Sequence, residues 1–453
     1  MENKSGIQQI KVWIETYGCQ MNKHDSEIVA GLLIKNGYEL TARMDLADVA
    51  LVNTCSVRQH AEQRALGRLS VLAGWKRKAP HRKIAVLGCM AQKEKHRLFE
   101  NQPFIDLIVG PDEYRFLPSL LEENNASCHT HLNSNETYSG LQPFRSQGIS
   151  GWVTIMRGCN NFCTYCIVPY TRGRERSRSC QEIDTEIFQM TENGFREITL
   201  LGQNVNSYHD GQVDFPELLK RTSYIPKLKR IRFTTSHPKD CSRRLLEVMA
   251  AESSVCPHLH LAVQSGSNRI LQKMNRKYTR EHFFRIIDLA RQLIPGLAIT
   301  TDVMVGFPGE SVQDFQDTVN LMQTVKFDDA FMYHYSSRPV TAAAKMKDQI
   351  PQKEKLRRLN AIIELQHNIS ASIRQKMKDS IVTVMPETTS KLSDNEWIGK
   401  TANSHMVVFP KSDTKPGTLT SVRIESCRGN TLRGVPVNKH NYQKIDAPCK
   451  SAI

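Results

Sequence analysis

The sequence lacks three features that would each define a class of protein. It has no apolar run near the roughly 18 residues that a membrane-spanning helix needs, and Met1 to Trp13 is mostly polar, without the apolar core of a secretory signal. Its twelve cysteines among 453 residues fall well below the roughly 8–10% found in disulfide-stabilised secreted proteins. We therefore expect a cytoplasmic protein without membrane contact, whose reduced thiols are available to metals.

Positive charge, in contrast, is present in excess. The chain has 61 Lys and Arg against 46 Asp and Glu, which gives a formal net charge of +15 and a pI near 9.3. This balance favours an anionic partner, and nucleic acid ahead of a membrane surface because no amphipathic membrane helix is evident. Many basic proteins bind no nucleic acid, so the charge alone leaves the partner open.

The length of 453 residues is too great for one core and predicts several domains. Short β-rich runs alternate with amphipathic stretches over residues 1–125, which predicts a doubly wound α/β domain with a parallel sheet. Residues 126–147 are polar and aperiodic, as in a linker. Six further strand–helix units over 148–378 predict a partial (βα)6 barrel of the TIM kind. Short strands over 379–440 predict a small all-β barrel or sandwich that binds oligonucleotides, and 441–453 is a tail.

The most specific pattern is a set of three cysteines within eight residues. Cys159, Cys163 and Cys166, here called the loop trio, follow the first predicted barrel strand. Structural zinc takes four ligands, usually as two pairs, and a ferredoxin run has a fourth cysteine before proline, which Pro169 lacks. Three thiolates suit a [4Fe-4S] cluster with one open iron. Zinc with a fourth ligand from elsewhere and three unrelated core thiols are the alternatives.

A second set of cysteines is spread along the first domain. Cys19, Cys55 and Cys89, here called the N-terminal trio, each stand just past the end of a predicted parallel strand. Such strand ends line the crevice in which doubly wound sheets bind ligands. Each cysteine alone is best explained as a buried core thiol, but three in equivalent positions favour a metal cluster.

The remaining six cysteines have no role that a pattern supports. Cys128 lies near His129 and His131, which offers a weak alternative metal site in the predicted linker. We expect Cys180, Cys241 and Cys256 to be structural. No role is assigned to Cys128, Cys180, Cys241, Cys256, Cys427 and Cys449.

The loop trio resembles the signature of a known superfamily. Cys-x3-Cys-x2-Cys, with the aromatic Tyr165 before the third cysteine, is similar to the motif of the radical S-adenosylmethionine (SAM) enzymes, which use a partial barrel. In that superfamily SAM chelates the open iron through its amino and carboxylate groups, and one electron cleaves SAM to a 5′-deoxyadenosyl radical. The resemblance implies a [4Fe-4S] cluster and SAM at the loop trio, where the cofactor carries the difficult chemistry.

Longer segments narrow the resemblance. The stretch GCNNFCTYCIVPYTRG at 158–173, the N-terminal trio and a C-terminal domain similar to TRAM modules resemble the methylthiotransferases from about Lys11 to Val437. Leu201–Asn206 and Phe233–Pro238 look like the MiaB branch of that family. The resemblance implies a second [4Fe-4S] cluster on the N-terminal trio and a TRAM domain that grips tRNA. It also implies addition of a methylthio group to C2 of N6-(dimethylallyl)adenosine beside the anticodon.

The aromatic C–H at C2 of adenine has no acidity to exploit, so we expect radical rather than acid–base chemistry. One SAM molecule would methylate a sulfur on the N-terminal trio's cluster, and a second would be the radical source at the loop trio. A reductase or flavodoxin-type protein would donate the electron, and a further partner the sulfur. The alternatives are a methylthiotransferase acting on threonylcarbamoyladenosine or on a ribosomal-protein aspartate, and a non-catalytic iron–sulfur RNA-binding protein. A protein that only carries electrons normally binds all four irons of its cluster with its own side chains. Each set here has three cysteines, which favours catalysis.

Polar residues near the loop trio and after the barrel strands are candidates to bind SAM, because the ends of barrel strands line the pocket. Capping and turn formation are the alternative roles. The candidates are Tyr165, Gln203, Asn204, Gln264, Ser265 and Asp302.

Four arginines after the loop trio are candidates to clamp tRNA phosphates, because guanidinium groups pair bidentately with oxygens. The alternative for such a run is a solvated face. In the C-terminal domain, Trp397 and Phe409 are expected to be available for stacking on bases. The four arginines are Arg172, Arg174, Arg176 and Arg178.

Overall fold

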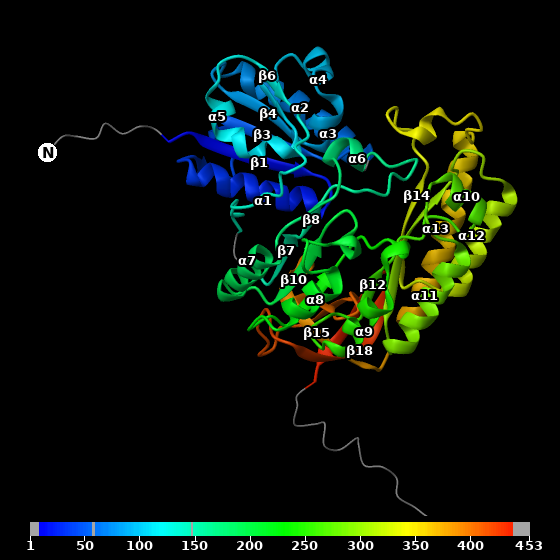
Figure 1. The fold of residues 1–453 in the computed structure, drawn as a ribbon. Coiled ribbons are helices and arrows are strands. Elements are labelled where there is room, and N and C mark those ends of the chain that lie inside the picture. Colours follow the sequence, from blue (N-terminus) through cyan, green and yellow to red (C-terminus); the bar gives the residue numbers. More distant parts are fainter. Residues whose placement is uncertain (1–8, 57–58, 146–147, 438–453) are drawn as a thin grey trace, which may run out of the picture.

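The computed structural model describes residues 9–56, 59–145 and 148–437. The predicted tail 441–453 with Cys449, and residues 438–440 of the predicted C-terminal domain, lie outside the described residues. Figure 1 shows an N-terminal α/β domain, a central half-barrel and a small C-terminal β domain. In the described part of the chain, no helix is long and apolar enough to cross a membrane.

The N-terminal domain is a parallel sheet of six strands in the order β2-β1-β3-β4-β5-β6. All six residues of β3 are buried, as in strands that helices cover on both faces. One face packs Ile28 and Leu117, and the other packs Leu69 and Leu98, which confirms the predicted doubly wound architecture. The strands are β1 (Lys11–Tyr17), β2 (Glu39–Leu40), β3 (Val49–Thr54), β4 (Lys83–Gly88), β5 (Leu107–Val109) and β6 (Ser127–His129). The helices are α1 (Gln20–Lys35), α2 (Gln59–Arg77), α3 (Cys89–Glu94), α4 (Arg97–Asn101) and α5 (Leu117–Glu122).

The predicted linker 126–147 is corrected by the structure, because its first part belongs to the N-terminal domain. β6 is the edge strand of the sheet and pairs with β5. Further on, Tyr138 is buried and its hydroxyl donates to the carbonyl of Pro111 at 2.9 Å. β6 is only three residues long and lies at the edge of the sheet. It therefore lacks the apolar run by which a sequence pattern would detect a strand.

The central domain is an open barrel of six parallel strands, as predicted. Two three-stranded sheets, β11-β10-β7 and β12-β13-β14, are joined by bridges between Ile231 and Val255 and between Ser236 and Leu261. The barrel strands are β7 (Ser150–Thr154), β10 (Glu197–Leu201), β11 (Arg230–Phe233), β12 (His258–His260), β13 (Ala298–Val305) and β14 (Asp329–His334). A separate antiparallel pair consists of β8 (Met156–Arg157) and β9 (Arg176–Ser177).

Most barrel helices begin at a residue whose side chain caps them. These side chains accept the backbone N–H three residues on, which satisfies a donor that the first helical turn leaves unpaired. The caps are Ser179, Asp214, Ser242, Ser267, Thr279 and Ser311. The helices of this domain are α6 (Val168–Arg172), α7 (Cys180–Glu192), α8 (Phe215–Ser223), α9 (Arg243–Ala251), α10 (Asn268–Lys273), α11 (Arg280–Leu293), α12 (Val312–Val325) and α13 (Gln352–Gln375).

The C-terminal domain is a closed five-stranded barrel. Sequence patterns missed β16, whose Ser393–Glu396 stretch is polar without alternation. Phe409 is 1% exposed in the barrel core, so the expectation that it stacks on bases is wrong. The strands are β15 (Ile381–Ser390), β16 (Ser393–Thr401), β17 (Met406–Pro410), β18 (Thr420–Arg428) and β19 (Thr431–Pro436).

The N-terminal and C-terminal domains contact opposite ends of the half-barrel (Figure 1). At the start of β11, Arg230 donates to the carbonyl of Lys400 in the C-terminal barrel at 2.6 Å. Beyond the end of β14, Arg338 pairs with Glu62 of the N-terminal domain at 3.1 Å. The N-terminal domain therefore covers the carboxyl ends of the barrel strands, where barrels of this kind bind their ligands.

Candidate active site

The N-terminal trio gathers at one edge of the N-terminal sheet. Cys19 and Cys55 follow β1 and β3, and Cys89 begins α3 directly after β4. Because β1, β3 and β4 are parallel neighbours, their carboxyl ends meet. A hydrogen bond with Cys55 lowers the pKa of Cys19 to about 6, whereas burial raises the pKa of Cys89. Thiols from three elements thus lie at the same edge of the sheet.

A glycine permits the close approach of strand ends at this edge. Gly88 has φ 91°, in the left-handed region, and a Cβ there would lie 2.6 Å from the carbonyl oxygen of Thr54 and 2.4 Å from Oδ1 of Asn53. Only a residue without a side chain lets Cys89 stand so close to the end of β3.

The loop trio lies between β8 and α6. Gly158 precedes it with φ 74°, and a Cβ there would lie 2.0 Å from the carbonyl oxygen of Arg174. The backbone N–H of Asn161 points to Sγ of Cys159 at 3.5 Å. Burial, reinforced by Cys163, raises the pKa of Cys166 to about 12. A metal would therefore have to displace a proton from Cys166 when it binds.

Arg276 is a site residue that sequence patterns missed. It is 8% exposed, donates from Nη1 to Sγ of Cys163 at 3.4 Å and from Nη2 to the carbonyl of Ala262 at 2.7 Å. Its guanidinium carbon also lies 5.2 Å from the ring centre of Tyr278. No motif or spacing in the sequence marks this residue, because it lies more than a hundred positions after the cysteine that it contacts.

Arg172 makes the corresponding contact at the N-terminal trio. It is 3% exposed, and it donates from Nε to Sγ of Cys89 at 3.3 Å and from Nη2 to Oδ2 of Asp25 at 2.6 Å. The prediction that Arg172 contacts tRNA phosphate is therefore wrong, because its charge is buried and satisfied inside the protein.

Two more arginines of the same run are also buried. Arg176 pairs with Asp112 at 2.9 Å, and Arg178 pairs with Glu186 at 2.7 Å. Their predicted phosphate contacts are wrong for the same reason. Arg174 alone of the four is exposed, and its guanidinium lies 5.3 Å from the ring centre of Phe162.

Two side chains after the second and third barrel strands have unpaired polar atoms. Nε2 of Gln203 contacts Sδ of Met21 at 3.2 Å, while its Oε1 is buried without a partner among the described residues. Nδ1 of His237 accepts the N–H of Lys239 at 3.2 Å, and its Nε2 likewise lacks a described partner. Burial, reinforced by Arg276, lowers the pKa of His237 to about 2. His237 is therefore neutral, with a hydrogen on Nε2.

Three other predicted SAM residues line the same barrel. The ring centre of Tyr165 lies 6.4 Å from that of Phe307, and burial raises the pKa of Tyr165 well above its usual value. Gln264 is buried with φ 67°. The half-buried carboxylate of Asp302 lies 3.5 Å from Nε2 of His260.

The structure argues against predicted SAM contacts by two residues. Asn204 donates from Nδ2 to Asp240 at 2.7 Å, and its Oδ1 accepts the N–H of His237 at 3.2 Å. The hydroxyl of Ser265 lies 3.3 Å from that of Thr318 on α12. Both side chains make the capping and packing contacts that were the alternative to cofactor binding.

The chemistry of the donor sets fits iron–sulfur clusters. No disulfide joins the eleven cysteines in the described ranges, and each trio combines three thiols with a buried arginine N–H. Among the described residues no three His, Cys, Asp or Glu side chains lie close enough for a single metal ion. Thiolates of a [4Fe-4S] cluster bind different irons and stand further apart.

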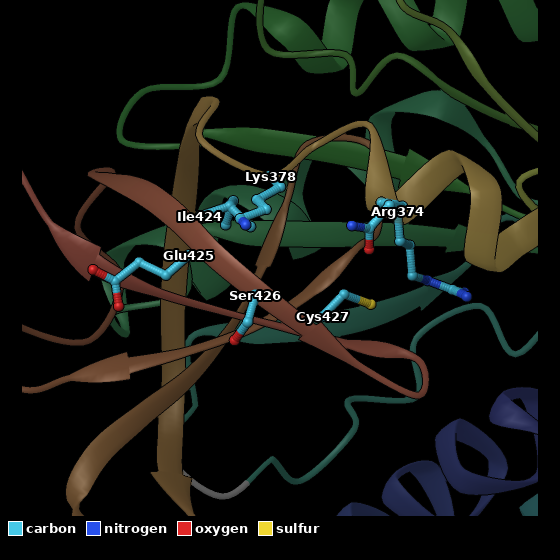
Figure 2. Close-up of a pocket in the computed structure, with 7 residues that line it drawn as sticks. Arg374, Lys378, Ile424, Glu425, Ser426 and Cys427 are labelled. Atoms are coloured by element: carbon cyan, nitrogen blue, oxygen red, sulfur yellow. The ribbon is translucent and has the colours of Figure 1, made fainter.

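Among the described residues, Cys128 and Cys427 have surroundings of their own, separate from the two trios. His129 and His131, near Cys128, face different carboxylates, Glu123 and Glu113, so the alternative metal site in the predicted linker finds no support. Cys427 lines a cavity of about 170 Å³ between α13 and β18. Figure 2 shows Cys427 and Glu425 leaving β18 in opposite directions. This cavity holds a single thiol and lies apart from both trios.

Models of three known families match the three parts of the chain. Residues 153–322 match the radical SAM superfamily, 375–437 match the TRAM domain, and 11–110 match a family described as "Uncharacterized protein family UPF0004". The chain also shares its fold with the radical S-adenosylmethionine methyltransferase TsrM from Kitasatospora setae, at 13% identity over 74% of each chain and a TM-score of 0.58. The fold and the loop trio therefore define a radical SAM enzyme.

Similarity over the whole chain identifies the family within that class. The chain is 46% identical over 439 residues to the tRNA-2-methylthio-N(6)-dimethylallyladenosine synthase of Parabacteroides distasonis, covering 95% of this chain and 96% of that protein. It is 43% identical over 432 residues to the enzyme of that name in Chlorobium phaeobacteroides, covering 94% and 97%. The chain belongs to the tRNA-2-methylthio-N(6)-dimethylallyladenosine synthase family, which confirms the predicted methylthiotransferase family and branch.

Proposed function

We propose that this protein adds a methylthio group to C2 of N6-(dimethylallyl)adenosine in tRNA, beside the anticodon. The observation that carries the proposal is the 46% identity over 95% of the chain to an enzyme named for that reaction. Two thiol trios within one chain give independent support, because the reaction needs both a radical source and a sulfur carrier.

Each trio is proposed to hold one [4Fe-4S] cluster. Such a cluster would supply the electron that cleaves SAM at the loop trio and the attachment point for sulfur at the N-terminal trio. Arg276 and Arg172 donate to Cys163 and Cys89. Their positive charges oppose the negative charge that three thiolates bring to each buried site.

The half-barrel is proposed to bind SAM through groups that complement its methionine moiety. The unpaired Oε1 of Gln203 is an acceptor for an ammonium group, and Nε2–H of His237 is a donor for a carboxylate. Tyr165, Gln264 and Asp302 complete the proposed pocket. Binding of SAM in this way would give hydrogen-bond partners to buried polar atoms that have none among the described residues.

The N-terminal domain is proposed to shield the radical from water. Met21 lies between the domains, 3.2 Å from Nε2 of Gln203 and 4.0 Å from the hydroxyl of Thr154. On the far side of the barrel mouth, Glu62 and Arg338 pair at 3.1 Å. These contacts hold the N-terminal domain against the carboxyl ends of the barrel strands, and a covered site would keep water from a radical.

tRNA is the proposed macromolecular partner, bound by the TRAM domain and by the exposed Arg174 near the site. Trp397 is half-buried, with Nζ of Lys411 4.3 Å from its ring centre, and a base would extend this stack. We further propose a reductase or flavodoxin-type electron donor, a separate sulfur donor and action in the cytoplasm, where tRNA is modified.

Anaerobic reconstitution tests this division of labour. The wild-type protein is expected to bind about eight irons, to release 5′-deoxyadenosine on reduction and to form the methylthio nucleoside in tRNA. Cys159→Ala is expected to lose both products. Cys19→Ala is expected to keep 5′-deoxyadenosine release and lose the methylthio product, and Cys427→Ala serves as the control that keeps both.

Mass spectrometry of the tRNA nucleosides reads out the result. Full methylthio product from Cys19→Ala contradicts the role of the N-terminal trio. Product on threonylcarbamoyladenosine instead of dimethylallyladenosine contradicts the proposed substrate.

A further inference from the structure

Arg172 belongs to the radical SAM domain, but its side chain reaches the N-terminal trio. It is the last residue of α6, six positions after Cys166. Its Nε–H points to Sγ of Cys89 at 3.3 Å, and its Nη2 donates to Asp25 at 2.6 Å. One side chain therefore connects the segment of the loop trio to a thiol of the other trio.

The third nitrogen of the same guanidinium has no partner among the described residues. Nη1 of Arg172 is buried and makes no hydrogen bond there. A buried N–H without an acceptor is strongly unfavourable, so native proteins rarely leave one. Two of the three nitrogens are directed to Cys89 and Asp25, which leaves Nη1 available to an anionic group bound beside the trio.

Asp25 fixes the charge of this guanidinium. Asp25 is fully buried and also lies 3.4 Å from the hydroxyl of Tyr138. The two buried charges oppose each other beside Cys89, so removing either one changes the electrostatic potential at the trio in a different direction.

We propose that Arg172 is a positioning residue for the cluster on the N-terminal trio. Its Nε–H donates to the Cys89 thiolate and its Nη1–H to a sulfur of the cluster, and its charge raises the cluster's reduction potential. Because Arg172 lies on the segment that follows the loop trio, it also ties the sulfur-carrying cluster to the site where SAM is cleaved. This inference rests on the proposed second cluster.

The test uses the full chain with Cys159, Cys163 and Cys166 all replaced by Ala, so that only the N-terminal trio binds iron. After anaerobic reconstitution, the midpoint potential and the electron paramagnetic resonance spectrum of the cluster are measured. Arg172→Gln is expected to shift the potential to a more negative value and to change the spectrum, because the positive charge is lost. Asp25→Asn is expected to shift the potential in the opposite direction.

A matched control separates this effect from the loss of any buried arginine. Arg178→Gln removes a buried guanidinium of the same segment, one that donates to Glu186 and to the carbonyl of Thr154 rather than to a thiol. This variant is expected to leave both readouts unchanged. Arg172→Lys keeps the charge and loses the planar set of donors. It is expected to restore most of the potential but not the spectrum, and it carries the test if Arg172→Gln does not fold.

Two results would overturn the inference in distinguishable ways. Equal potentials and spectra for the Arg172 and Asp25 variants and the Arg178 control show that Arg172 does not act on the cluster. Absence of about four irons in the parent chain, before any change at Arg172, shows instead that the proposed second cluster is wrong.

Discussion

The three cysteines of the loop trio lie within eight consecutive residues. In the N-terminal trio, 36 positions separate Cys19 from Cys55, and 34 positions separate Cys55 from Cys89. The geometry of the first depends on one turn after Gly158. The geometry of the second depends on the register of β1, β3 and β4 in one sheet. Both sites nevertheless receive a buried arginine from a distant part of the structure. Local and non-local assembly therefore produce similar donor sets, and they should fail in different ways.

The largest expected effects come from two glycines, Gly158 directly before the loop trio and Gly88 directly before Cys89 of the N-terminal trio. Gly158→Ala places a Cβ 2.0 Å from a backbone carbonyl, and Gly88→Ala places one 2.6 Å from another. Each variant is expected to lose nearly all iron at its own trio and to keep the other, measured by iron content and 5′-deoxyadenosine release. Gly211→Ala shares the left-handed conformation, with φ 101° but open space around it, and is the control for backbone strain alone. Loss of both clusters in either variant would refute the independence of the two sites.

The next effect concerns a buried carboxylate on α7. Glu186 pairs with Arg178 of the same domain and with Arg145, which also pairs with Glu27 on α1. Burial acts to raise the pKa of Glu186, but Arg178 and Arg145 prevail and lower it to about 2 from 4.5. Because the folded-state pKa is depressed, this stabilisation is complete above pH 4.5 and declines as the pH falls toward 2. Glu186→Gln is expected to destabilise the protein by about 3–5 kcal/mol at pH 7, measured by urea unfolding. A destabilisation of equal size at pH 7 and near pH 2 would contradict this assignment.

A cavity in the N-terminal core should affect only the non-local trio. Leu87 is fully buried in β4, two positions before Cys89, and Leu87→Ala is expected to destabilise its domain by about 2–5 kcal/mol. Iron at the N-terminal trio should then be lost at lower urea than in the wild type, while the loop trio keeps its iron. Ile198→Ala, a comparable change in β10 of the half-barrel, should leave the N-terminal trio's urea dependence unchanged.

The smallest effect is expected at the surface. Arg174→Gln should leave stability within about 0.5 kcal/mol of the wild type. It should weaken tRNA binding and reduce the slope of log affinity against log salt by about 1, because one phosphate contact is lost. Arg243→Gln, an exposed arginine on α9 paired with Glu247, is the control. An unchanged slope for Arg174→Gln would remove this residue from the tRNA interface.

Sequence patterns predicted β1, β3 and β4 of the N-terminal sheet and all six strands of the half-barrel, because these strands contain buried runs such as those of β3 and β13. They failed where an element lacks such a run. β6 was taken for a linker and β16 was missed, since one is a short edge strand and the other begins with four polar residues. The arginine run 172–178 was assigned to tRNA because charge in a sequence carries no information about burial.

The sequence by itself determined the loop trio and the half-barrel, because three cysteines within eight residues and hydrophobic periodicity are local properties of the chain. Only the tertiary structure decided which charges lie beside the thiols. Arg172 and Arg276 reach thiols 83 and 113 positions away, and their burial depends on packing between elements that no local pattern records. A buried charge is tolerated only beside partners that compensate it, and those partners come together only in the folded chain.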